Sequence, residues 1–195
     1  MCSIIKNQIS AEFLKELVYR HEIDTENEEL KNSSTPTDKV PGIILQNEKF
    51  ILSYLNWGIQ FSQDSPSIYN SRLETIKSKN FWWDLLYQNR AVIPMSGFYE
   101  WNKVGKRKNL YRVFLPEKEI FYVAAIYYVM NRIKYSSLIT TIPNKFVKRV
   151  HPRMLIIFDD FSEARKFLTV EAQEAAEMCL PYSDDKKMGL ERVFF

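Results

Sequence analysis

The chain has 195 residues, 46% of them hydrophobic, which suits one compact domain over residues 1–195. Its five glycines lie at least eight residues apart, so the glycine-rich loops of P-loop and dinucleotide-binding proteins are absent. Two Cys and two His are too few for a zinc-finger or disulfide framework, and we expect no metal and no cofactor. No apolar run is long enough to span a membrane, so we expect a cytoplasmic protein.

The net charge of +3 is distributed unevenly along the chain. Residues 103–153 carry 12 basic and 2 acidic residues, a net charge of +10, whereas residues 1–69 and 154–195 each carry −4. A basic segment between acidic flanks indicates a surface that faces a polyanion such as nucleic acid. The alternative is that these Lys and Arg side chains only decorate exposed strands and loops.

Hydrophobic periodicity predicts an amphipathic helix over Ser10–Tyr19, followed by a polar loop over residues 22–40. Runs rich in β-branched and aromatic residues then predict seven strands, at Gly42–Leu45, Phe50–Trp57, Ala91–Trp101, Leu110–Leu115, Ile120–Val129, Tyr135–Thr141 and Met154–Phe158. Helices are predicted at Ser71–Ser78, Trp82–Tyr87, Ser162–Leu168 and Glu171–Cys179, with a short basic turn or helix at Lys145–Val150. The pattern predicts an α+β fold with a mainly antiparallel, barrel-like β core, peripheral helices and a helical C-terminal part over residues 160–195.

Cys2 is the most informative single position. Removal of Met1, which is general when the second residue is small, leaves an amine and a thiol on adjacent carbons. Both are partly available as nucleophiles near neutral pH. Such a pair can condense with an aldehyde, first to an imine and then to a thiazolidine ring, or act as an N-terminal nucleophile on an amide. A cysteine without any role in a frayed terminus is the alternative.

Two further positions have the chemistry of acid–base groups. Glu100 ends the apolar segment Ile93–Trp101, where burial raises the pKa of a carboxyl, although a solvated strand end is common. His151 lies in the basic segment, which favours a neutral imidazole that can shuttle protons; a histidine held by local hydrogen bonds is the alternative. Asn70 has a sufficient structural role as the cap of the following helix, and Arg72 and Glu74 can be surface charges.

Together these features resemble the SOS-response-associated peptidase (SRAP) family. The resemblance rests on motifs whose order fits from Cys2 to about Phe158: Cys2, Trp57-Gly58, Asn70-Ser71-Arg72-Leu73-Glu74-Thr75, Arg90 through Trp101, Thr140-Thr141-Ile142-Pro143-Asn144 and His151-Pro152-Arg153-Met154. The combination is specific, although no single motif is. The chain departs from the family pattern at Ser3-Ile4, where Gly-Arg is usual, and at Ala91, where Cys is common.

The resemblance implies an enzyme of the DNA damage response that binds abasic sites in single-stranded DNA and forms a covalent thiazolidine cross-link through mature Cys2. It also implies the autoproteolytic peptidase activity for which the family is named. The implied catalytic residues are Cys2 as nucleophile, Asn70 as the group that positions it, Glu100 as general acid and base, and His151 for opening the sugar ring. The implied DNA-binding residues are Arg72 and Arg153 on phosphates, Trp57 and Trp101 shaping the site or stacking on bases, and Thr140.

Two other functions remain open from the residues: a cysteine peptidase that uses Cys2 with Glu100 or His151, and a non-catalytic binder of single-stranded nucleic acid. We expect a monomer with no obligatory protein partner and no membrane contact, associated with the nucleoid when bound to DNA.

Overall fold

The computed structural model describes residues 2, 4–7, 9, 31–62, 64–105 and 107–194. The helix predicted over Ser10–Tyr19 and residues 22–30 of the predicted polar loop lie outside these residues. The rest of that loop contains the short strand β2 (Ser33–Ser34) and leads into the first long strand.

Five strands close into a ring. They are β3 (Lys39–Gln46), β4 (Lys49–Trp57), β6 (Arg90–Met95), β9 (Phe121–Met130) and β10 (Ile133–Thr141). The pairs β4–β3, β3–β6, β6–β9 and β9–β10 are antiparallel, and a parallel β10–β4 pair closes the ring. This arrangement confirms the predicted α+β fold with a barrel-like core.

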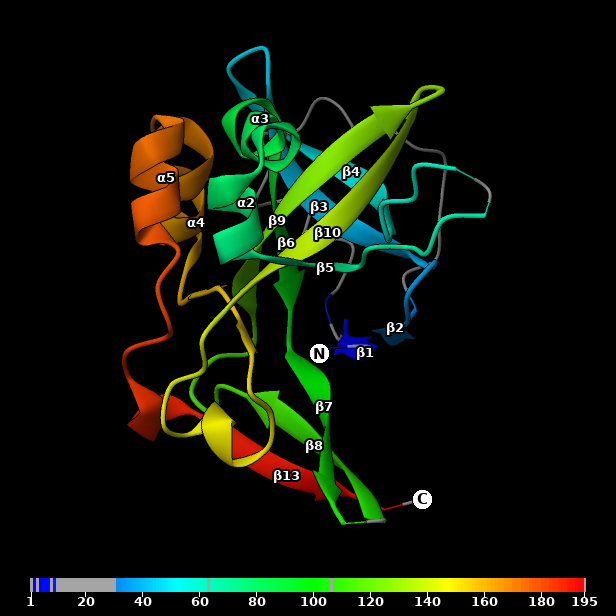
Figure 1. Cartoon of the computed structure of the whole chain (residues 1–195). Helices are drawn as coiled ribbons and strands as arrows, with labels where there is room; N and C mark the ends of the chain where they lie inside the picture. Colours follow the sequence, from blue (N-terminus) through cyan, green and yellow to red (C-terminus); the bar gives the residue numbers. More distant parts are fainter. Residues whose placement is uncertain are drawn as a thin grey trace.

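A second sheet extends from one end of this barrel (Figure 1). Its strands, in spatial order, are β13 (Gly189–Val193), β8 (Arg107–Phe114), β7 (Gly97–Val104), β1 (Ile4–Lys6) and β2. Strand β13 lies in the part of the chain that was predicted to be only helical. Its two exposed charged residues, Glu191 and Arg192, are adjacent and do not alternate with apolar residues, so the strand gives only a weak sequence signal.

The single strand predicted over Ala91–Trp101 is two strands, because the chain passes from the barrel to the second sheet at Ser96. The Ser96 backbone N–H donates to the carbonyl of Lys6 at 2.9 Å, and its hydroxyl donates to the same carbonyl at 3.2 Å. Ser96 therefore ties the junction of β6 and β7 to β1, the strand that follows Cys2.

Four helices cover one side of the barrel: α2 (Leu73–Ser78), α3 (Asn80–Gln88), α4 (Phe161–Thr169) and α5 (Ala172–Met178) (Figure 1). The helix predicted from Ser71 begins at Leu73, because the preceding residues form β5 (Asn70–Arg72), which pairs in parallel with β10. Two short 3₁₀ helices, η1 (Val147–Arg149) and η2 (Asp185–Lys187), and two short strands, β11 (Met154–Leu155) and β12 (Ile157–Phe158), complete the elements. Within the described part of the chain, no helix is both long and apolar enough to cross a membrane.

The strands of the ring send alternate side chains to two buried clusters. The outer cluster packs against the helices and includes Ile43, Leu52, Val92, Ile126 and Ile139. The inner cluster includes Val40, Leu55, Ile93, Val123 and Leu138, together with side chains of the second sheet and Cys2. The start of the chain is therefore part of the interior packing, which places Cys2 where strands β1 and β7 meet the barrel.

Candidate active site

The pairing of β1 with β7 positions Cys2 at the site. Ile4 lies opposite Tyr99 in this antiparallel pair, so the chain before Ile4 continues alongside Glu100. Cys2 is 1% exposed, and its thiol donates to the carbonyl of Ile4 at 3.4 Å. Burial, followed by the nearby Glu100 carboxylate, raises the pKa of the thiol well above its usual value. The thiol therefore keeps its proton near neutral pH until a base removes it.

Asn70 holds the backbone of Cys2. Its side-chain amide donates to the Cys2 carbonyl at 2.7 Å, from strand β5 beside Leu138 of β10. The interpretation of Asn70 as a helix cap is wrong: the residue preceding α2 is Arg72, and α2 has no side-chain cap. Because Asn70 lies in strand β5 and not at the start of helix α2, its side chain reaches the Cys2 carbonyl.

Glu100 lies on β7 and is 2% exposed. Burial raises the pKa of its carboxyl to about 7, an effect that a hydrogen bond from the Cys2 backbone partly offsets. A group with this pKa is present in both protonation states at neutral pH, so it can give a proton in one step and take one in another.

His151 follows η1 and faces Glu100, with 3.8 Å between its Nδ1 and Oε1 of Glu100. Nδ1 also lies 3.1 Å from the backbone nitrogen and 3.0 Å from the carbonyl of Arg153. Burial lowers the pKa of the imidazole, so the ring is neutral at physiological pH. The structure thus brings together the four residues expected to be catalytic: Cys2, Asn70, Glu100 and His151.

The Arg153 side chain is hydrogen-bonded to other residues of the protein. Two of its guanidinium nitrogens donate to the two carboxylate oxygens of Glu74 at 2.8 Å each, and one also donates to the carbonyl of Thr140 at 2.8 Å. The hydrogen bonds from Arg153 are the main reason that the pKa of Glu74 is lowered. Thr140 is 2% exposed, and its hydroxyl donates to the Ser71 carbonyl at 3.3 Å. Arg72, in contrast, is exposed.

Glu74 is a residue that sequence reasoning missed. It was read together with Arg72 as a surface charge, yet it joins helix α2 to the loop that carries His151 through Arg153. The signal was its position two residues after Arg72 in a motif that otherwise carries site residues.

The two tryptophans have different environments. Trp57 is fully buried; its indole N–H donates to the carbonyl of Tyr69 at 2.9 Å, and its ring lies edge-on to the Tyr69 ring. It offers no open face to a base, and its placement fits the expected alternative of shaping the site. Trp101 follows Glu100 and is 38% exposed, so its ring is accessible for stacking.

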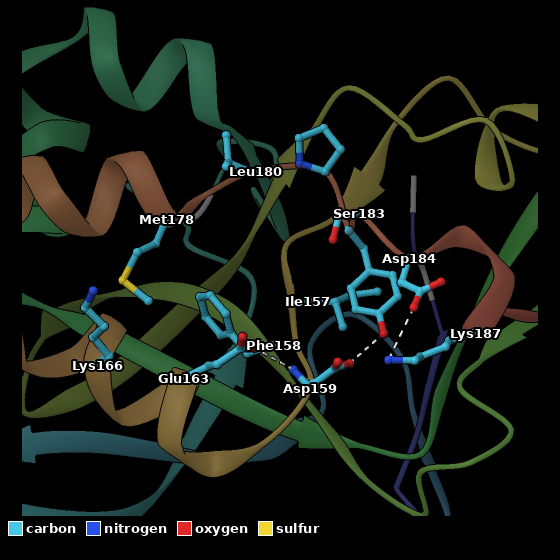
Figure 2. Close-up of a pocket in the computed structure, with 12 residues that line it drawn as sticks. Ile157, Phe158, Asp159, Glu163, Lys166, Met178, Leu180, Ser183, Asp184 and Lys187 are labelled. Carbon is cyan, nitrogen blue, oxygen red and sulfur yellow. Dashed lines mark hydrogen bonds and ion pairs between the residues drawn. The ribbon is translucent and has the colours of Figure 1, made fainter.

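One cavity lies away from these residues. It has a volume of about 520 Å³ and lies between β12, α4 and the segment that follows α5 (Figure 2). Its charged groups bind one another: Tyr182 donates to Asp159 at 2.6 Å, and Lys187 pairs with Asp184 at 3.2 Å. The cavity therefore presents little unsatisfied polarity to a ligand. Among the described residues, no group of three or more His, Cys, Asp or Glu side chains could hold a metal ion.

Comparison with known proteins identifies the family. A model of the SOS response associated peptidase (SRAP) family matches residues 1–193. The chain belongs to the SRAP family. SRAP relatives include two Bacillus subtilis proteins named abasic site processing proteins, YoqW and YoaM. YoqW is 30% identical over 66% of this chain and 62% of its own length, and YoaM is 29% identical over 77% of this chain and 72% of its own. The chain thus spans less than two thirds of YoqW. The yeast abasic site processing protein YMR114C is 24% identical over 73% of this chain and 43% of its own length.

Solved structures with low sequence identity share the SRAP fold seen here. A phage-related protein from Bordetella bronchiseptica has a TM-score of 0.78 at 17% identity and covers 98% of this chain and 94% of its own. A protein from Bacteroides thetaiotaomicron has a TM-score of 0.71 at 22% identity and covers 84% of this chain and 78% of its own. The similarity to the Bordetella bronchiseptica protein shows that the shared fold includes nearly the whole chain.

Proposed function

We propose that this SRAP protein processes abasic sites in single-stranded DNA by forming a thiazolidine cross-link through Cys2, once removal of Met1 has freed the Cys2 amine. The observation that carries the proposal is the buried Cys2 beside Glu100, with Asn70 holding its carbonyl. The names of YoqW and YoaM support abasic DNA as the substrate.

The first step forms an imine at the Cys2 nitrogen. The amine attacks the aldehyde carbon of the opened abasic sugar, and a proton moves from nitrogen to oxygen to give a carbinolamine. Glu100 in its protonated form donates to the departing hydroxyl, water leaves, and the nitrogen lone pair forms a C=N bond, which gives a protonated imine that keeps its N–H and leaves Glu100 as a carboxylate. A carboxyl with a pKa of about 7 is half protonated at neutral pH, so this acid is available.

The second step closes the ring. The Cys2 sulfur adds to the carbon of the protonated imine, its proton passes to the Glu100 carboxylate formed in the first step, and the C=N electron pair returns to the ring nitrogen, which keeps its N–H. Because burial raises the pKa of the Cys2 thiol, closure needs such a base. One carboxyl thus serves both steps and is returned to its starting state, with one water released overall.

His151 acts before either step. An abasic sugar is closed in its resting form, and opening it moves a proton from the anomeric hydroxyl to the ring oxygen. A neutral imidazole 3.8 Å from the Glu100 carboxylate can exchange that proton. Glu100 and His151 therefore act on different bonds of the same substrate.

Intact mass spectrometry tests the proposal. Protein is weighed before and after incubation with a single-stranded oligonucleotide that carries one abasic site, then heated in denaturant. We expect the starting mass to lack Met1 and the product to equal protein plus oligonucleotide minus one water. The same oligonucleotide without the abasic site should give no adduct.

Cys2→Ser is the matched variant, because it keeps the amine and removes the thiol. It should give at most an imine that is lost on heating. A heat-stable adduct from this variant, or from protein that retains Met1, would disprove the thiazolidine mechanism.

A further inference from the structure

Three exposed cations lie on the turn between β10 and His151. Lys145, Lys148 and Arg149 surround the 3₁₀ helix η1. The sequence contains no Asp or Glu between Glu119 and Asp159. No carboxylate of a described residue lies within 4.0 Å of the side-chain nitrogens of these three residues. Their charges are therefore not neutralised by the described part of the molecule.

Two other arginines of the basic segment are paired with carboxylates, whereas Arg149 donates to the Phe146 carbonyl at 3.1 Å and lies over the Phe146 ring. Arg153 forms the paired hydrogen bonds with Glu74, and Arg112 lies 3.6 Å from Glu191 with its guanidinium over the ring of Phe114. The net charge of residues 103–153 therefore overstates the positive charge that is available to bind an anion. Three of the available cations lie close together on the turn at η1.

The turn is held rigidly. The Asn144 side-chain oxygen accepts from the Val147 backbone N–H at 2.9 Å, and its amide donates to the carbonyl of Tyr182 at 2.9 Å. Val147 is fully buried, which anchors the middle of the turn in the inner cluster. Lys145 and Lys148 are three residues apart, so on a turn with 3₁₀ geometry they share a face, and Arg149 is next to Lys148 in the sequence. A rigid support lowers the entropy lost when these side chains bind an anion.

The turn is also fixed to the catalytic residues. Asn102, two residues after Glu100 on β7, donates through its side-chain amide to the carbonyl of Arg149 at 2.9 Å. The backbone N–H of His151 donates to the carbonyl of Val147 at 2.9 Å. The turn that carries the cations is therefore hydrogen-bonded to the strand that carries Glu100 and to His151.

We infer that Lys145, Lys148 and Arg149 form a binding surface for the phosphates of single-stranded DNA next to the nucleotide that reaches Cys2. Cations that are not paired with carboxylates bind the phosphates of single-stranded nucleic acid without reading its sequence. The identity of the ligand rests on the proposed function. The location of the surface rests on the contacts of the turn.

The test is the salt dependence of DNA binding. Affinity for an intact, fluorescently labelled single-stranded oligonucleotide without an abasic site is measured by anisotropy at several salt concentrations. Lys148→Ala/Arg149→Ala should flatten the log–log slope by about 1.4, which is about 0.7 for each lost phosphate contact on single strands. Lys49→Ala/Arg132→Ala removes the same charges from exposed hairpin turns at the other end of the molecule (Figure 1), and its slope should equal that of the wild type.

Arg149→Lys distinguishes the effect of charge from that of side-chain shape, because it keeps the cation and should keep the slope. Thermal unfolding of every variant verifies that it is folded. Equal slopes for the two double variants, or a wild type that does not bind the oligonucleotide, would overturn the proposal. The chemistry at Cys2 is scored separately, by adduct formation in the wild type. A wild type without adduct but with the expected difference in slopes would refute the proposed cross-link and leave the phosphate surface in place.

Discussion

Burial decides the protonation state of each reactive side chain. It keeps the proton on the Cys2 thiol, raises the pKa of Glu100 to about 7 and favours the neutral ring of His151. The sequence predicted the directions for Glu100 and His151. For His151, however, the expected cause was the positive charge of the basic segment, whereas the main cause in the structure is desolvation, with the charge of Arg153 a lesser one. Sequence counts charges along the chain but does not show which are already paired.

Substitutions of Glu100 and His151 should have different effects. Glu100→Gln should slow cross-linking by roughly 10²–10⁴-fold with any aldehyde, because both imine formation and ring closure use its carboxyl. His151→Ala should slow reaction with the closed abasic sugar far more than reaction with an oligonucleotide that carries an open-chain aldehyde. Single-turnover cross-linking on the two substrates measures both effects. If each variant slows both substrates alike, the two residues act together in holding Cys2.

Glu74→Gln should change binding and chemistry in opposite directions. Loss of the carboxylate releases the Arg153 guanidinium, so single-stranded DNA should bind more tightly and the log–log salt slope should steepen by about 0.7. The backbone of Arg153 also contacts the His151 ring, so reaction with the closed sugar should slow, by about tenfold, a fraction of what a positioned acid–base group contributes. Anisotropy and single-turnover cross-linking measure the two effects. A variant that only weakened binding would show that Glu74 has no such positioning role.

At the scale of elements, the strands of the barrel were the most predictable part. The strands predicted at Phe50–Trp57 and Tyr135–Thr141 agree with β4 and β10 within two residues at each end. Their β-branched and aromatic runs are bounded by turn residues, and this is local information. The point at which one predicted strand divides into two was not predictable from local sequence. Ser96 separates two strands only because Lys6, 90 residues away in the sequence, accepts its hydrogen bonds.

The turn after β4 depends on Gly58, which has φ +131° and would place a Cβ 2.2 Å from the Ser67 hydroxyl oxygen. Gly58→Ala should therefore lower the free energy of unfolding by about 1–3 kcal/mol, measured by urea denaturation. Gly105→Ala is the matched control, because Gly105 has φ +62° but open space around its Cβ position. It should cost about 1 kcal/mol, the price of the left-handed conformation alone. Equal losses for the two variants would show that contact with Ser67 adds nothing.

At the scale of the whole molecule, the site draws on residues that are distant in sequence. Cys2 precedes β1, Asn70 lies on β5, Glu100 lies on β7 and His151 lies in the loop after η1, and no local pattern places them together. Their meeting was expected from the family resemblance alone. The same limit applies to the basic segment, whose residues lie on the β7–β8 hairpin, the β9–β10 hairpin and the turn at η1. The two hairpins end at opposite ends of the molecule (Figure 1).

The buried carboxyl should also influence the global stability. The pKa of Glu100 is about 7 in the folded protein and about 4.5 when exposed, so between these pH values the native state holds a proton that the unfolded state has lost. Stability should therefore fall as the pH rises from about 4.5 to 7, by roughly 3 kcal/mol at most. Glu100→Gln should remove this part of the pH dependence. Urea unfolding of both proteins at pH 5, 6 and 7 would measure it, and parallel pH profiles would contradict the raised pKa.

The pairing of β1 with β7 sets an order of events during synthesis. Cys2 is made about 100 residues before the end of the strand that buries it, because β7 ends at residue 104. At 5–20 residues per second, the ribosome needs roughly 5–20 s to supply that strand. During this interval Cys2 has no β7 to pack against, and an aminopeptidase has access to the preceding bond. Folding then buries Cys2. Whether a given molecule can form the cross-link therefore depends on whether Met1 is removed before folding is complete.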